Sequence, residues 1–195
     1  DAKEAWHEML AQGMEPNSIT LACIMDALVE GRRVEEALSI FQDWHDRLQY
    51  DTVVYSTLMK GFAAISDSDR AMSLHEDMQR SGVPSNQVVY TALISACARA
   101  GQMRRAEAAV SSMIADGWKP NTITYSVIIH GYCVRGDILS AMAIFQKHFD
   151  NGASADCVLF NTLLGCCVRR SKWELAQSLL DMMTTQGVAP SNFTI

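Results

Sequence analysis

A repeat of 35 residues constrains the fold of this chain more than any other feature of its sequence. Three rows recur at this spacing, one aromatic, one alanine and one glycine: Tyr55, Tyr90, Tyr125 and Phe160; Ala71, Ala106, Ala141 and Ala176; and Gly82, Gly117, Gly152 and Gly187. A fixed period of about 20 to 50 residues is typical of small structural units that bury their apolar faces only against stacked neighbours. The sequence therefore predicts a repeat protein rather than a globular enzyme.

The repeat boundaries follow from the same spacing. The predicted repeats are 18–51, 52–86, 87–121, 122–156 and 157–191, flanked by a partial repeat at 1–17 (second helix and loop) and the start of a truncated repeat at 192–195. The step from Ala37 to Ala71 is 34 residues, and Leu48 stands where the loop glycine is expected, which indicates the deletion of one loop residue. Because both ends lie inside repeats, we expect exposed apolar faces there and a tendency to fray or associate.

Each repeat carries the pattern of two amphipathic helices. In 52–86, apolar residues recur twice at helical spacing, first Val54, Tyr55, Leu58, Met59 and Phe62, then Ala71, Leu74 and Met78. A glycine followed by a proline, as in Gly82 and Pro84, ends the second helix. The predicted fold is all-α, an α-solenoid of helix-turn-helix hairpins with the aromatic and alanine rows buried and a concave inner surface.

Composition and motifs narrow the possible functions. The formal charge of -6 and a pI near 5.3 provide no global field for a polyanion, so any nucleic-acid contact must be local. The six cysteines are expected to be reduced, buried thiols. The chain has no Walker loop, no Gly-x-Ser-x-Gly elbow, no deaminase motif and no apolar run long enough to span a bilayer. We therefore expect no catalytic residue, no metal, no cofactor and no membrane partner.

Several stretches resemble the pentatricopeptide repeat family, and the resemblance covers the whole chain. They are Val-Val-Tyr-Ser-Thr-Leu-Met-Lys-Gly (53–61), Ile-Thr-Tyr-Ser-Val-Ile-Ile-His-Gly-Tyr-Cys (123–133) and Gly-Trp-Lys-Pro-Asn (117–121). The resemblance implies binding of single-stranded RNA in a mitochondrion or chloroplast, for RNA processing, stabilisation or translation. In such repeats two or three side chains read one base.

The resemblance also implies which residues read the base edges. The pairs are Ser56 with Asn86, Thr91 with Asn121, Ser126 with Asp156, and Asn161 with Ser191. A small hydroxyl leaves room for a purine, an amide such as Asn86 can donate to adenine N1, and a carboxylate such as Asp156 can accept from guanine. Asn161 is bulkier and suits a pyrimidine. Read from N to C as 5′ to 3′, the repeats from 52 to 191 predict A-A-G-C, whereas Ala22 beside Asp51 leaves 18–51 without an assigned base.

Two further rows complete the predicted interface. The apolar clamp for base faces consists of Ile19, Val53, Val88, Ile123, Val158 and Phe193. Arg99 and Arg169 match the family's phosphate-contacting position, which Glu30, Ala64 and Val134 occupy in the other repeats; Arg135, Arg170 and Lys172 lie nearby as candidates to compensate. So few cations predict modest affinity with a shallow salt dependence. An alternative interpretation makes the apolar row ordinary helix-start residues, and Asn86, Asn121 and Asp156 turn formers.

Two other functions stay open. The acidic charge is compatible with a protein-interaction scaffold, such as a solenoid subunit of a ribosome or transcription assembly, which other proteins would bind. A third hypothesis makes these repeats the positioning arm of an RNA-processing enzyme whose catalytic domain lies outside residues 1–195.

Overall fold

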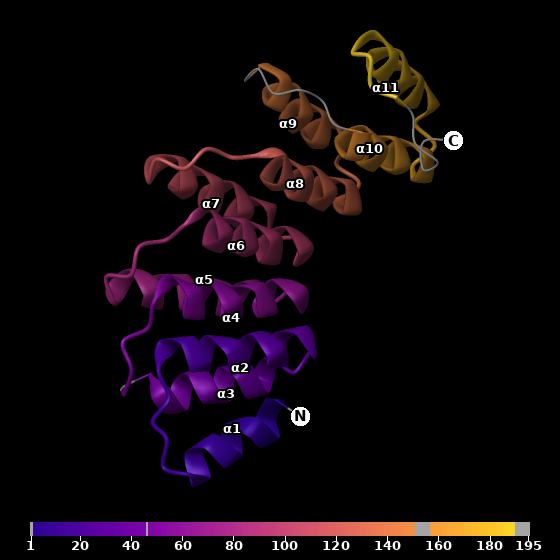
Figure 1. Cartoon of the computed structure of the whole chain (residues 1–195). Helices are drawn as coiled ribbons and strands as arrows, with labels where there is room; N and C mark the ends of the chain where they lie inside the picture. Colours follow the sequence, from indigo (N-terminus) through magenta and orange to yellow (C-terminus); the bar gives the residue numbers. More distant parts are fainter. Residues whose placement is uncertain (1, 46, 151–156, 190–195) are drawn as a thin grey trace. The chain divides into compact units, whose positions relative to one another are not determined.

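The computed structural model describes residues 2–45, 47–150 and 157–189 (Figure 1). Every regular element in these ranges is an α-helix, which confirms the all-α prediction. The helices are α1 (Ala2–Ala11), α2 (Ser18–Glu30), α3 (Val34–Trp44), α4 (Thr52–Ala64), α5 (Ser68–Arg80), α6 (Gln87–Arg99), α7 (Met103–Ala115), α8 (Thr122–Arg135), α9 (Ile138–Asp150), α10 (Cys157–Arg169) and α11 (Trp173–Thr185). Among the described residues, no helix combines the length and the apolar character needed to cross a membrane.

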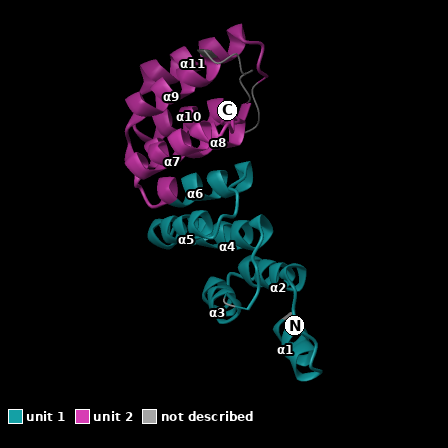
Figure 2. Ribbon diagram, turned by 90° about the vertical axis from the view of Figure 1, so that its left-hand side faces the viewer, with its two compact units in different colours: residues 1–96 teal, residues 97–195 magenta. Residues whose placement is uncertain are grey.

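The chain divides into two compact units, which are coloured separately in Figure 2. Unit 1 comprises Asp1–Ala96 and unit 2 comprises Cys97–Ile195, so the division falls within α6. In unit 1, α2 packs against α3 and α4, and α4 packs against α5. In unit 2, α8 packs against α9 and α10, and α10 packs against α11. Within each unit, successive helical hairpins therefore stack through their first helices, as in an α-solenoid.

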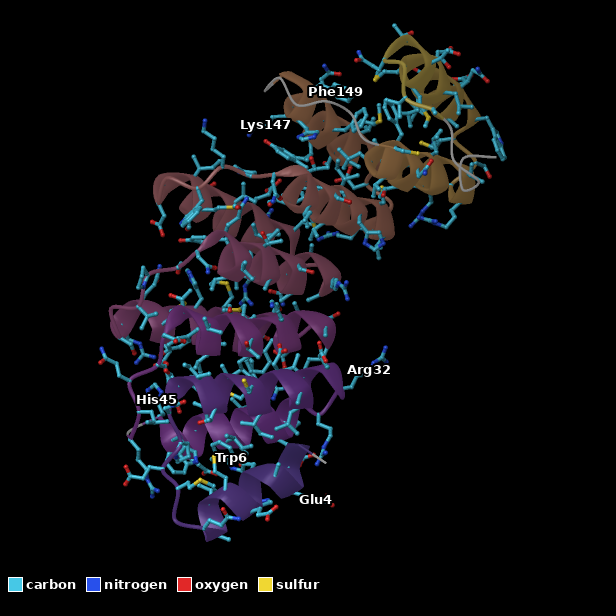
Figure 3. All side chains as sticks on the ribbon, viewed as in Figure 1. Glu4, Trp6, Arg32, His45, Lys147 and Phe149 are labelled. Carbon is cyan, nitrogen blue, oxygen red and sulfur yellow. The ribbon has the colours of Figure 1, made fainter. Side chains whose placement is uncertain are left out.

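The recurring rows form the core. All five alanines of the second helices are buried: Ala37, Ala71, Ala106, Ala141 and Ala176. The four aromatic rings of the first helices are also buried: Tyr55, Tyr90, Tyr125 and Phe160. Burial of a tyrosine requires a partner for its hydroxyl, and Tyr55 donates to a carboxylate oxygen of Asp77 at 3.0 Å. Figure 3 shows these and the other described side chains on the ribbon.

Two glycines allow close contact between neighbouring repeats. A Cβ atom on Gly61 would lie 2.9 Å from Val29 Cγ2 and 3.2 Å from Val34 Cγ1 in unit 1. A Cβ atom on Gly131 would lie 2.7 Å from Met103 Sδ and 3.0 Å from Ala98 Cβ in unit 2. The first residue of a second helix, Val34 or Met103, thus packs onto the bare backbone of the following first helix.

Left-handed residues stand at two places in the repeat. In the loop that follows a second helix they are glycines, as predicted for Gly82, Gly117 and Gly187 and found also for Gly13. The fourth predicted glycine, Gly152, lies outside the described residues. The turn between the two helices of each repeat also has a residue with positive φ, in the order Arg32 (59°), Ser66 (59°), Gly101 (73°), Gly136 (79°) and Ser171 (53°). Only glycine adopts this conformation without a steric cost. The turn is therefore the same in all five repeats although its residue is not.

Tyr50 anchors the connection between α3 and α4, in the repeat that is one residue shorter than the others. The loop joins α3, which ends at Trp44, to α4, which begins at Thr52. The Tyr50 side chain is buried, its ring centroid lies 4.7 Å from that of Phe41, and its hydroxyl donates to the Phe41 carbonyl. The missing residue shortens the helix and not the loop, because α3 has 11 residues where α5 and α7 have 13, and the connection 45–51 is longer than 81–86 or 116–121. The expectation of a deletion in the loop is therefore wrong.

The cysteines are free thiols, and most are packing residues. Cys97, Cys133, Cys166 and Cys167 are buried and Cys157 is half-buried. Burial raises the pKa of the Cys133 and Cys167 thiols, which disfavours the reactive thiolate. The expectation of burial is wrong for Cys23, which is exposed and lines an apolar cavity of about 290 Å³ between α1 and α2.

Candidate nucleic-acid interface

The apolar row predicted to clamp bases lies outside the core. Each member is the second residue of a first helix, and the exposed fractions are 69% for Ile19, 56% for Val53, 45% for Val88, 61% for Ile123 and 58% for Val158. Phe193 lies outside the described residues. A single exposed apolar side chain is normal, but one at the same place in five successive repeats is not explained by packing.

The first residue of each predicted reading pair lies one turn further along the first helix. The hydroxyl of Ser56 donates to the Val53 carbonyl at 3.0 Å, and that of Thr91 donates to the Gln87 carbonyl at 2.7 Å. Such a bond uses the hydroxyl hydrogen and leaves oxygen lone pairs as acceptors. Thr91 is half-buried, whereas only 8% of Ser56 is exposed.

Ser126 and Asn161 hold the equivalent place in unit 2, and both are half-buried. The side-chain nitrogen of Asn161 donates to the Cys157 sulfur at 3.3 Å, within the first turn of α10. The amide is therefore held close to the start of its helix, beside the exposed Val158.

The second residue caps the next helix in the two pairs for which the structure describes it. The amide oxygen of Asn86 accepts the backbone N–H of Val89 at 2.9 Å, and that of Asn121 accepts the N–H of Thr124 at 3.0 Å. Asp51 caps α4 in the same way, through bonds from Val53 and Val54 at 3.0 and 3.1 Å. Asp156 and Ser191 lie outside the described residues.

These caps bear on the alternative interpretation, in which the last residue of each repeat is an ordinary turn former. Asparagine, aspartate and serine cap helices about equally well, so capping accounts for a small polar residue here but not for the choice among the three. The cap uses the amide oxygen of Asn86 and Asn121, whereas the amide nitrogen takes no part in it. A hydrogen-bond donor therefore remains for another partner.

The arginines predicted to contact phosphate are exposed, whereas two of the nearby cations that could compensate for missing ones contact the protein itself. Arg99 and Arg169 are exposed last residues of α6 and α10. In contrast, Arg135 donates to the Gly101 carbonyl at 2.7 Å, and the Arg170 guanidinium lies against Gly136, within 2.5 Å of where a Cβ atom would stand. Arg135 thus holds the turn of the preceding repeat, and Arg170, 35 residues later, lies against the equivalent turn, a structural role that the sequence did not reveal.

The arrangement defines a class of protein. A solenoid of helical hairpins that repeats one exposed apolar residue and one capping polar residue along its first helices is a modular binding protein. A family model described as the PPR repeat family matches residues 50–99 and 85–134, and one described as the PPR repeat matches residues 19–47, 123–147 and 158–188. The chain belongs to the pentatricopeptide repeat family.

Relatives and solved structures agree with this assignment. A pentatricopeptide repeat-containing protein of Arabidopsis thaliana is 32% identical over 80 residues, which cover 40% of this chain and 16% of that protein. The structure of pentatricopeptide repeat protein PPR10 from maize matches with a TM-score of 0.76 at 26% identity over 97% of this chain and 27% of PPR10. The PPR domain of Arabidopsis thaliana protein-only RNase P 1, solved in complex with tRNA, matches in fold with a TM-score of 0.75 at 17% identity over 91% of this chain and 94% of that domain.

Proposed function

We propose that this chain is a sequence-selective binding module for single-stranded RNA in which each repeat contacts one base. The carrying observation is the row of five exposed apolar side chains at the second position of the first helices, Ile19 to Val158, with a polar residue one turn later in four of the five repeats. Aromatic and apolar side chains that stay in solvent at a regular spacing suit the faces of successive bases.

The relatives supply independent support for RNA as the ligand. PPR10 was solved in complex with an 18-nt psaJ RNA element, and the PPR domain of the RNase P protein was solved with tRNA. This chain spans 27% of the maize PPR10 chain and 16% of the Arabidopsis protein to which it is similar. Any activity of the whole protein is therefore part of our proposal. We place its role in processing, stabilisation or translation of RNA in a mitochondrion or chloroplast.

The proposed base order is A-A-G-C over residues 52–191. The structure describes both members of the pair Ser56 and Asn86, and both lie in unit 1. The Asn86 nitrogen, which its cap does not use, is the donor that adenine N1 requires. Asp156 would accept from guanine in the third repeat, and Asn161 would select a pyrimidine in the fourth.

Fluorescence anisotropy with labelled RNA tests this function. We expect U-flanked A-A-G-C to bind at least about tenfold more tightly than U-flanked G-C-A-A, which differs at all four positions. Two phosphate contacts predict a slope of about −1.4 for log K against log salt. Equal affinity for both RNAs would contradict base reading. Absence of RNA binding, with partner proteins that stay bound after nuclease treatment, would favour the scaffold function instead.

A further inference from the structure

A cavity of about 760 Å³ in unit 2 shares Asn121 with the base-reading row, but its other lining residues have no role in the function proposed above. Its walls come from the loop between α7 and α8 and from the C-terminal part of α9, where Figure 3 labels Lys147. The residues that concern the argument are Trp118, Lys119, Asn121, Tyr125, Lys147 and His148. A cavity of this size falls in the range of small-molecule sites, roughly 300 to 1,000 Å³.

Four residues of this cavity differ from the residues at the same places in neighbouring repeats of this chain. One repeat earlier, Val83 and Pro84 stand in place of Trp118 and Lys119, and Ser112 and Met113 stand in place of Lys147 and His148. One repeat after α9, Met182 and Met183 occupy the last two places. The four departures come from two separate segments of the chain, yet all of them line the same cavity. Residues that vary between the repeats of this chain therefore converge here.

The chemistry of the four residues is complementary to a nucleotide. Trp118 is 38% exposed and offers an indole face on which a base can stack. Lys119 and Lys147 are exposed and provide ammonium groups for a phosphate. His148 is buried against Tyr125, with ring centroids 4.4 Å apart, and forms an aromatic floor.

We infer that this cavity binds a nucleoside phosphate, with the base on Trp118 and the phosphate between Lys119 and Lys147. The nucleotide has two possible sources, a residue of the bound RNA strand or a free mononucleotide. Asn121, which lines the cavity and also caps α8, connects it to the reading row. The site does not depend on the A-A-G-C order, and it can be tested without RNA.

The test uses the 195-residue chain, labelled with nitrogen-15, and follows the Trp118 indole N–H signal during titration. The probes are adenosine 5′-monophosphate, adenosine, which lacks the phosphate, and ribose 5-phosphate, which lacks the base. Trp118→Val and Lys147→Ser introduce the residues that other repeats carry at these places, so both preserve the repeat pattern. Arg104→Ser is the matched control, because Arg104 is an exposed cation of the same unit that does not line the cavity.

We expect adenosine 5′-monophosphate to shift the Trp118 signal saturably, and each of the two fragments to bind at least about fivefold more weakly. Lys147→Ser should weaken the mononucleotide at least about threefold, and Arg104→Ser should not. An indole signal unmoved at about 10 mM nucleotide would overturn the inference. So would equal weakening by Lys147→Ser and Arg104→Ser.

Binding of an RNA oligonucleotide to the Trp118→Val variant separates the two sources. If the variant loses affinity for both RNA and the mononucleotide, the strand supplies the nucleotide. If it loses affinity for the mononucleotide alone, the ligand is free. The mononucleotide titration does not depend on the order of bases in an RNA. If the wild-type chain shows no selectivity for A-A-G-C, the proposed base reading fails, but the test of the cavity still holds.

Discussion

The two units are built from the same repeat but differ in charge. Residues 1–96 contain 7 Lys or Arg and 15 Asp or Glu, a formal charge of −8, whereas residues 97–195 contain 9 and 7, a formal charge of +2. Both predicted phosphate contacts, Arg99 and Arg169, belong to unit 2. Since phosphate neutralisation supplies much of the affinity for a strand, the affinity of the proposed RNA binding is expected to depend mainly on unit 2.

Ion pairs reinforce this difference. In unit 1, Glu36 lies 2.5 Å from both Lys3 and Arg33, and Arg70 bridges Glu35 and Asp67 at 2.7 and 2.6 Å. In the part of unit 2 that the structure describes, neither Arg99 nor Arg169 forms an ion pair. Several cations of unit 1 therefore serve the fold, while these two arginines of unit 2 stay available to a ligand.

The largest expected effect comes from removing both arginines of unit 2. Arg99→Ala with Arg169→Ala should weaken RNA binding about 25-fold at 0.1 M salt, about fivefold for each lost contact, and should bring the salt slope close to zero. Anisotropy over a series of salt concentrations measures both. Arg80→Ala with Arg104→Ala removes the same charge from exposed positions on second helices and should have little effect. A comparable loss in this control would mean that net charge, not position, sets the affinity.

Adding a cation to unit 1 should reduce the difference between the units. Ala64, the exposed last residue of α4, occupies the place that Arg99 and Arg169 hold in their helices. Ala64→Arg should tighten RNA binding about fivefold at 0.1 M salt and make the salt slope steeper by about 0.7. Ala115→Arg, which adds the same charge at the exposed end of α7, should not. Equal gains from both variants would refute a specific phosphate position.

The shared turn predicts a similar response from both units. Ser66 in unit 1 and Ser171 in unit 2 have φ values of 59° and 53°. Replacement of either by glycine should stabilise the chain by about 0.5 kcal/mol, because the relief of the left-handed strain exceeds the added entropy of the unfolded chain. Chemical denaturation measures this effect. Ser73→Gly, inside α5, should destabilise by a similar amount, and a loss in all three variants would argue against strain at the turn.

The smallest effect concerns the ion pairs of unit 1. Hydrogen bonds from Arg33 and Lys3 lower the pKa of Glu36 to about 2. This pairing favours the folded state above the ordinary glutamate pKa of 4.5, and its contribution is lost as the pH falls towards 2. A carboxyl-carbon NMR titration of Arg33→Gln should show the pKa of Glu36 moved upwards, towards 4.5. An unchanged midpoint would show that Arg33 does not hold this carboxylate.

Much of the fold could be predicted because the sequence repeats. One period located the buried Ala71 and Tyr55 rows and the glycine at Gly82, since each recurs where its packing or backbone role recurs. The left-handed turn between helices had no such signal, because Arg32 and Ser66 stand where Gly101 and Gly136 do later. Where the surrounding packing imposes the left-handed conformation, the type of residue does not predict it.

The candidate site was less predictable, because it depends on side-chain environment. The family resemblance implied Ser56 as a base-reading residue, but its hydroxyl turns back to the Val53 carbonyl and little of it is exposed. Arg135 looked like a spare cation, yet it holds the Gly101 carbonyl. The cavity at Trp118 has no sequence signature, because its walls lie in two segments whose convergence requires the fold.

The most direct test of base reading is to replace Asn86, the last residue of the repeat 52–86, by aspartate. Asn86→Asp preserves the helix cap, as Asp51 shows for α4, but replaces the amide donor with an acceptor. Wild-type chain and variant are each titrated with U-flanked A-A-G-C and G-A-G-C, and Asp51→Asn serves as a control in the repeat without an assigned base. We predict that the wild type prefers A-A-G-C, that Asn86→Asp prefers G-A-G-C, and that Asp51→Asn leaves the preference unchanged. An equal change in affinity for both RNAs on Asn86→Asp would contradict one-base reading by this repeat.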